Sequence, residues 1–89
     1  MDVFIYTYEP LPCGLDEVED ALEAALGDRG RVTGGGTGIS DARSNFDLLI
    51  KDGVLSEEQV LSLVRQVVLD LDLPKGTMVD INGKEHLLD

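Results

Sequence analysis

Apolar residues recur at helical spacing in two stretches that alternate with strand-like stretches, and this alternation limits the folds open to the chain. The two stretches, residues 15–26 and 55–71, each put their apolar side chains on one stripe of a helix. The strand-like stretches, in which β-branched, aromatic or alternating apolar residues favour extended backbone, are residues 3–8, 31–39 and 46–52. A last pair of strand-like arms flanks Asn82-Gly83, which is typical of a type I′ hairpin turn.

This order of elements predicts an α+β fold in a single domain over residues 1–89. Strand, helix, strand, strand, helix, strand is the order of the ferredoxin-like βαββαβ two-layer sandwich. In that fold the sheet is antiparallel and both helices cover one face, and here the terminal hairpin adds a short strand. Residues 40–45 are expected to form the turn between the second and third strands.

The first strand is apolar on both sides, so its pattern alone leaves its orientation open. In the usual strand order of the ferredoxin-like fold, the first and third strands are central. The apolar residues then expected to face the helices are Val3, Ile5, Phe46, Leu48 and Ile50, and the aromatic residues expected on the opposite face are Phe4, Tyr6 and Tyr8. Ser56 and Gln59 form a capping-box pattern at the start of the second helix.

Acidic residues outnumber basic residues by 18 to 7, which gives a formal net charge of −11 at pH 7. This charge disfavours nucleic acids and anionic membranes, whose phosphates attract cations, and it favours a basic protein partner. No apolar stretch has the length of a membrane span, and the N-terminus lacks the basic start of a signal peptide. Cys13 is the single cysteine and allows no disulfide within the chain, so a cytoplasmic location is expected.

Glycine fills four of the five positions from Gly34 to Gly38. Glycine-rich turns hold phosphates in nucleotide sites, but a P-loop needs a lysine after its last glycine, and here Ile39 and Ser40 follow. A Rossmann turn follows a strand and opens a helix, whereas this segment follows a helix and leads into a strand. We therefore expect a bulged or kinked edge strand. Its surface without side chains is available to a partner at Gly34, Gly35 and Gly36.

The residue types that catalysis and metal binding require do not gather in the sequence. His86 is the single histidine and Cys13 is the other soft metal ligand, whereas zinc sites need several such ligands at short spacings. The carboxylates that follow Cys13 oppose formation of its thiolate, so a nucleophilic role is not expected. No calcium-loop pattern is present. We therefore expect no enzyme activity, no cofactor and no metal ion.

Three segments together resemble a family of short bacterial proteins. The segments "GRVTGGGTGI", "NFDLLI" and "LPKGTMVDI" resemble immunity proteins that are encoded beside polymorphic or contact-dependent toxins, and the likeness spans most of residues 16–81. The resemblance implies a small cytoplasmic protein that binds a toxin domain and blocks it. It carries over no catalytic or binding residue, because its motif consists of glycines and hydrophobic residues. The acidic charge agrees with it, since many toxin domains are basic nucleases.

These observations predict a non-catalytic acidic binding protein, an immunity protein or similar inhibitor that neutralises a basic protein such as a toxin domain. The expected contact residues are the acidic and glycine residues Asp16, Glu19, Asp20, Glu23, Asp41, Asp47, Gly34, Gly35 and Gly36. One alternative is a small enzyme or subunit that holds a phosphorylated ligand at Gly34–Gly38. A second alternative is a structural module that forms homo-oligomers, such as a homodimer, through the aromatic sheet face or an edge strand.

Overall fold

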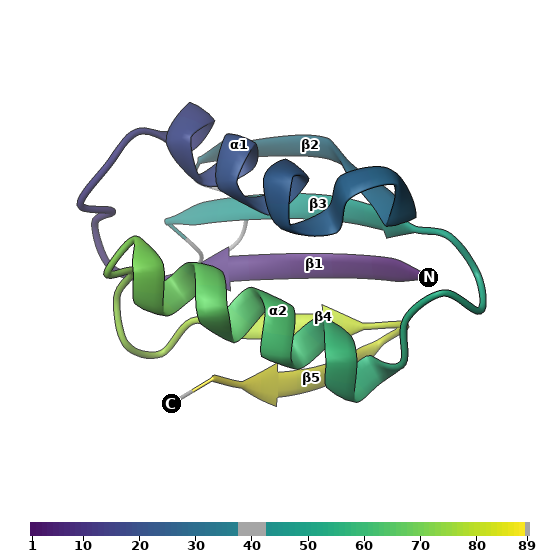
Figure 1. Cartoon of the computed structure of the whole chain (residues 1–89). Coiled ribbons are helices and arrows are strands. Elements are labelled where there is room, and N and C mark those ends of the chain that lie inside the picture. Colours follow the sequence, from purple (N-terminus) through teal and green to yellow (C-terminus); the bar gives the residue numbers. More distant parts are fainter. Residues whose placement is uncertain (38–42, 89) are drawn as a thin grey trace.

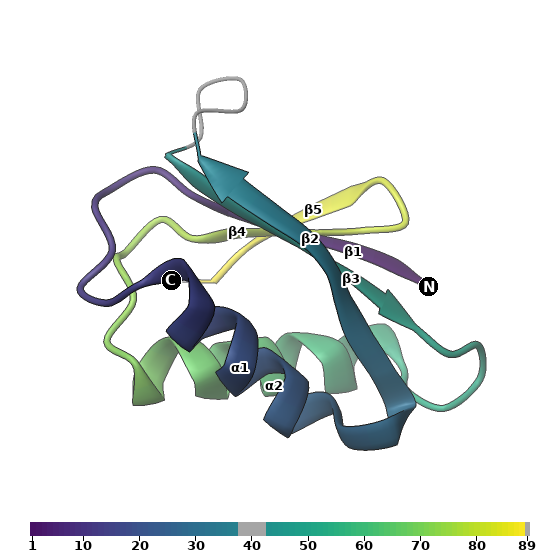
Figure 2. The same cartoon turned by 90° about the horizontal axis from the view of Figure 1, so that it is seen from above.

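The structure is a computed structural model that describes residues 1–37 and 43–88. Within these residues, a five-stranded antiparallel sheet carries two helices on one face (Figures 1 and 2). The strands, in chain order, are β1 (Asp2–Thr7), β2 (Gly30–Thr37), β3 (Ser44–Ile50), β4 (Met78–Ile81) and β5 (Lys84–Leu87). The helices are α1 (Leu15–Leu26) and α2 (Glu57–Asp70), and a short 3-10 turn, η1 (Gly27–Arg29), follows α1.

The strands lie in the order β2-β3-β1-β4-β5 across the sheet. The expected α+β class, the antiparallel sheet and the placement of both helices on one face are confirmed. The terminal hairpin adds β5 outside β4, so the sheet has one strand more than a four-stranded βαββαβ unit. In Figure 1, α1 lies over the β2 and β3 side of the sheet and α2 lies over the side of β1 and β4.

The prediction that residues 40–45 form a turn is wrong for Ser44 and Asn45. Ser44 and Asn45 belong to β3, where they pair with Thr7 and Tyr6 of β1. Serine and asparagine favour turns in isolation, but β1 offers both residues a ladder of backbone hydrogen bonds, and both become buried. The first strand also ends one residue earlier than expected, at Thr7, so that Tyr8 follows the strand and is 42% exposed.

The core lies between the sheet and the helices. All five residues that were expected to face the helices from β1 and β3 are buried: Val3, Ile5, Phe46, Leu48 and Ile50. The helices oppose them with one apolar stripe each, whose buried members are Val18, Leu22, Leu26, Val60, Val64 and Val67. The core-facing residues of the strands and the apolar stripes of the helices therefore pack into one cluster, as the sequence pattern predicts.

The two helices begin in different ways. Before α2, the expected capping box is formed: the Gln59 backbone N–H donates to Ser56 Oγ at 3.1 Å, and the Ser56 N–H donates to Gln59 Oε1 at 2.8 Å. Gly14 precedes α1 and has no side chain with which to cap it, although acidic residues occupy its first turn.

The C-terminal end of α1 is capped by a side chain. Beyond this end, Arg29 donates to the carbonyl oxygens of Leu26 and Ala25 at 3.0 and 2.7 Å.

The terminal hairpin has the expected two-residue turn. Asn82 and Gly83 both have positive φ, 51° and 87°, as a type I′ turn requires. The Gly83 N–H donates to Asp80 Oδ1 at 2.8 Å, and the Asp2 N–H donates to Asn82 Oδ1 at 3.3 Å. The second of these bonds ties the turn to β1.

The glycine segment forms β2, an edge strand that pairs with β3 alone among the described strands. Its register shifts between Val32 and Gly34, so the expected bulge in an edge strand is confirmed. At Gly30, an added Cβ would lie 2.7 Å from the Leu49 carbonyl oxygen, so a side chain has no room there. At Gly35, an added Cβ would lie 3.0 Å from Glu19 Oε2, and glycine therefore lets α1 approach the strand closely.

Candidate functional site

The helices leave one face of the sheet uncovered by any helix of the described chain (Figure 2). Successive residues of a strand point to opposite faces, so residues that alternate with the core residues point to this side. We call this side the open face. Its residues on the three middle strands are Asp2, Phe4, Tyr6, Asn45, Asp47, Leu49, Met78 and Asp80. Beyond them lie Arg31, Gly34 and Gly36 of β2 and Glu85 and Leu87 of β5.

Carboxylates flank an aromatic ring on the open face. Phe4 pairs with Asp47 on one side and with Asp80 on the other, and Asp80 pairs in turn with Glu85. Side chains of directly paired residues stand about 5 Å apart at their Cβ atoms, so these four side chains form one line across four strands. We call them the acid–aromatic row. Phe4, Asp47 and Asp80 are half-buried and Glu85 is exposed.

The pKa of Tyr6, in the next line of side chains on the open face, reflects the negative charge of this row. Tyr6 pairs with Asn45 and Met78. Burial raises the pKa of the Tyr6 hydroxyl, and the nearby carboxylates of Asp80, Asp47 and Glu85 raise it further. The same field that disfavours a tyrosinate favours a cation near the ring.

Asn45 holds one carboxylate of the row in place. Its Nδ2 donates to Asp47 Oδ1 at 3.2 Å. Asn45 is 4% exposed, and its buried Oδ1 has no donor among the residues that the structure describes. The side chains around Tyr6 are therefore rich in hydrogen-bond acceptors, which suits a ligand that carries several donors.

The acidic residues of α1 form a second surface, on the other side of the sheet. Asp16, Asp20 and Glu23 are exposed, and Glu19 is half-buried with its carboxylate beside Gly35. Their spacing places all four on one stripe of the helix, which borders the edge strand β2.

The structure thus divides the residues that the sequence predicts as contacts. Asp47, Gly34 and Gly36 belong to the open face, whereas Gly35 points to the helix side and lies beside Glu19 of the α1 stripe. Asp41 lies outside the described residues. Sequence reasoning missed Asp80 and Glu85. Asp80 alternates with the apolar residues Val79 and Ile81, which indicates its side of the sheet, but the place of Asp80 and Glu85 in one row with Phe4 depends on long-range pairing.

The reactive residue types occupy unreactive surroundings. Burial raises the pKa of the half-buried Cys13 thiol, and the charge of Glu17, a hydrogen bond with Glu17 and the charge of Asp16 raise it further, so the thiol stays protonated at neutral pH. His86 is a half-buried residue of β5. Across residues 1–37 and 43–88, no group of three or more His, Cys, Asp or Glu residues is arranged so that it could hold a metal ion. None of the helices in the same residues has the length and apolar character needed to cross a membrane.

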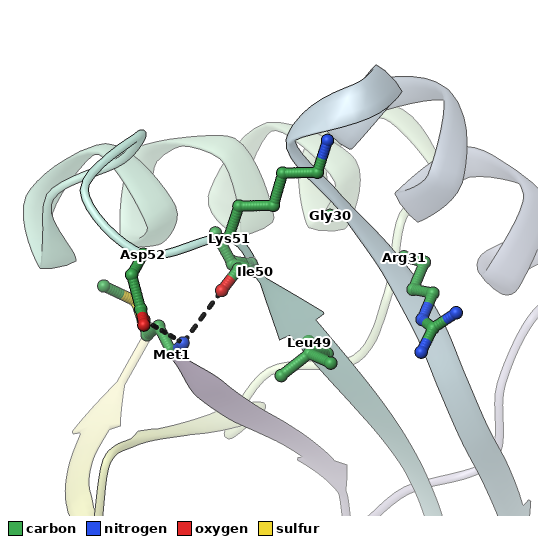
Figure 3. Close-up of a pocket in the computed structure, with 7 residues that line it drawn as sticks. All are labelled: Met1, Gly30, Arg31, Leu49, Ile50, Lys51 and Asp52. Atoms are coloured by element: carbon green, nitrogen blue, oxygen red, sulfur yellow. Dashed lines mark hydrogen bonds and ion pairs between the residues drawn. The ribbon is translucent and has the colours of Figure 1, made fainter.

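A hollow of about 420 Å³ lies at the end of the sheet where β2 begins and β3 ends (Figure 3). It is lined by Met1, Gly30, Arg31, Leu49, Ile50, Lys51 and Asp52. The amine of Met1 donates to the Ile50 carbonyl oxygen at 2.8 Å and to Asp52 Oδ1 at 3.1 Å. Of the glycines in β2, the one that lines this hollow is Gly30, outside the predicted phosphate segment Gly34–Gly38.

Comparisons with known proteins, by sequence and by structure, match no family model, no curated protein and no solved structure.

Proposed function

We propose that this chain is a non-catalytic binding protein that holds a basic protein partner on its open face. The observation that carries the proposal is the acid–aromatic row, in which Phe4 lies between Asp47 and Asp80. An immunity protein or similar inhibitor that neutralises a basic toxin domain fits this description. The resemblance of the glycine and hydrophobic segments to such immunity proteins supports the same proposal.

An arginine or lysine of the partner finds two kinds of attraction at this row. A cation over the ring of Phe4 or Tyr6 is attracted by the ring electrons, which contributes about 0.5–2 kcal/mol. The carboxylates of Asp47 and Asp80 pair with the same cation from either side. Exposed apolar side chains at the borders of the face, Leu49 and Leu87, supply contact area that does not depend on charge.

The charge of the whole chain supports the same partner. A net charge of −11 attracts a basic surface from a distance and accelerates the encounter. Two copies of the open face would set identical carboxylates against each other, so this face is better suited to a basic partner than to the homodimer considered above. The phosphorylated-ligand hypothesis for Gly34–Gly38 stays a prediction, and the described glycines of that segment form a strand rather than a phosphate-binding turn.

The fold supplies a rigid platform for such binding. We infer a ferredoxin-like sandwich in which β5 is added beside β4, formed as one domain over residues 1–89 in the cytoplasm. The strand order and the two helices on one face support this inference. Residues on sheet strands hold their positions more firmly than residues on loops, so the row is preorganised for a partner.

The first test is capture of the partner. If a toxin gene lies beside the gene for this chain, the C-terminal domain of that toxin should co-purify with the chain and should lose its toxicity when bound. Failure of the chain to bind any product of an adjacent gene would contradict the immunity proposal.

Two matched double variants then locate the contact surface. Asp47→Asn with Asp80→Asn removes two carboxylates from the open face, and Asp16→Asn with Asp20→Asn removes two from α1, so both change the net charge from −11 to −9. We expect the open-face variant to weaken binding more than tenfold, because close charge pairs at interfaces couple by about 1.5 kcal/mol or more. The α1 variant should weaken binding about twofold through the lost long-range attraction alone. The reverse order of these effects would place the contact on the α1 stripe and overturn the assignment to the open face.

A further inference from the structure

The hollow at the start of β2 is lined by basic residues, although the chain as a whole is acidic. The chain has 7 basic residues against 18 acidic residues, and two of the basic residues, Arg31 and Lys51, line this one hollow. Both are exposed, and none of the described carboxylates lies within ion-pair distance of either. The carboxylate that lines the same hollow, that of Asp52, is instead bonded to the amine of Met1.

The floor of the hollow is apolar. Figure 3 shows the side chain of Leu49 against the β3 strand, with Lys51 and Arg31 on either side of Gly30 and their charged ends pointing away from each other. Leu49 is 40% exposed, so its apolar side chain is open to a ligand at this end of the sheet. A side chain at position 30 could not fill the hollow, because a Cβ added to Gly30 would clash with the Leu49 carbonyl oxygen.

We propose that this hollow binds a small organic monocarboxylate whose apolar part rests on Leu49 and whose carboxylate pairs with Arg31, while the charge of Lys51 adds attraction from the other side of Gly30. A guanidinium presents two parallel N–H groups that match the two oxygens of a carboxylate. The volume of about 420 Å³ lies within the range of small-molecule sites, and such sites combine an apolar lining with few polar groups. This inference does not rest on the proposed function.

The charge of the ligand favours a monocarboxylate over a phosphate monoester at this hollow. The field of a chain with a net charge of −11 repels a dianion about twice as strongly as a monoanion, because the energy is proportional to the ligand charge. A phosphate monoester carries a charge of about −1.5 to −2 near pH 7. The two cations also attract a dianion about twice as strongly, but the cost of removing an anion from water grows with the square of its charge, so a partly apolar hollow favours the monocarboxylate.

Amide NMR titration with octanoate tests the proposal. We expect saturable shifts at Gly30, Arg31 and residues 49–52, and we expect 1-octanol, which has the same chain and no charge, to bind at least tenfold more weakly. Octyl phosphate at pH 8 should also bind more weakly than octanoate. Shifts that do not saturate, shifts centred elsewhere, or equal binding of octanol would overturn the proposal, and tighter binding of octyl phosphate would overturn the assignment to a carboxylate.

Two substitutions of the same type distinguish the site from the overall charge. Arg31→Gln removes a cation that lines the hollow, and Arg65→Gln removes an exposed cation on α2, so both change the net charge from −11 to −12. We expect Arg31→Gln to weaken octanoate binding about tenfold, as the loss of a charge-assisted hydrogen bond implies. Arg65→Gln should leave it within about twofold. Equal effects of the two variants would mean that octanoate responds to the overall charge and would refute a site at Arg31.

Discussion

Two glycines of β2 differ in the space that surrounds them, although both are in extended backbone of the same strand. An added Cβ at Gly30 would lie 2.7 Å from the Leu49 carbonyl oxygen and 3.1 Å from Ile50 Cα, and neither backbone atom can move without shifting β3. An added Cβ at Gly36 would have the Asn45 Oδ1 as its nearest neighbour, at 3.7 Å, which is an ordinary contact. The strand therefore requires glycine at the first position and only tolerates it at the second.

We predict that Gly30→Ala destabilises the protein by about 1–3 kcal/mol, the usual cost of forcing an extra methyl group into a packed region. Gly36→Ala serves as the matched control. It should be neutral or stabilising by up to about 1 kcal/mol, because alanine loses less conformational entropy than glycine on folding. Urea unfolding of the two variants beside the natural chain measures both effects, and equal destabilisation would show that the space at Gly30 does not matter.

The two helices receive unequal support at their N-termini. Ser56 and Gln59 close a reciprocal capping box at α2, whereas Gly14 offers α1 no side-chain cap. We predict that Ser56→Ala destabilises the protein by about 1 kcal/mol, since the Gln59 N–H loses its acceptor at the end of the helix. Ser62→Ala, at an exposed position within α2, is the control and should change stability by less than about 0.5 kcal/mol. Thermal or urea unfolding compares the two, and a Ser62 effect as large as the Ser56 effect would argue against the cap.

Self-repulsion acts across the whole molecule. The described residues contain two ion pairs, Met1 with Asp52 and Lys84 with Glu57, so most of the described carboxylates have no cationic partner, and the net charge is −11. Salt screens this repulsion as the Debye length falls from about 10 Å at 0.1 M to about 3 Å at 1 M. We predict that the free energy of unfolding rises when sodium chloride is increased over this range.

The double variant Asp16→Asn with Asp20→Asn is the control for this prediction. It lowers the charge density on one exposed surface, so its stability should depend less on salt than that of the natural chain. A salt response of the opposite sign would mean that ion pairs contribute more to stability than repulsion removes.

The local sequence pattern determined which segments form helices, strands and the hairpin, and which side of most strands faces the core. Alternation in β3 placed Phe46 in the core, helical spacing placed Val18 and Val60 there, and the Asn82-Gly83 pair placed the hairpin. These features depend on backbone dihedrals and hydrogen bonds between near neighbours in the chain, which a short segment specifies by itself. The bulged edge strand was predictable for a similar reason, because a run of glycines weakens a strand wherever it lies.

Tertiary pairing decided the rest. Ser44 and Asn45 have the composition of a turn, and they form strand because β1, far away in the sequence, offers them partners. Asp47 was a candidate contact from the sequence, but its alignment with Phe4, Asp80 and Glu85 depends on the register of four strands. The presence of Arg31 and Lys51 at the same hollow likewise requires β2 and β3 to pair. A register is chosen by the burial of whole strand faces against the helices, and that energy exists only when the segments have come together.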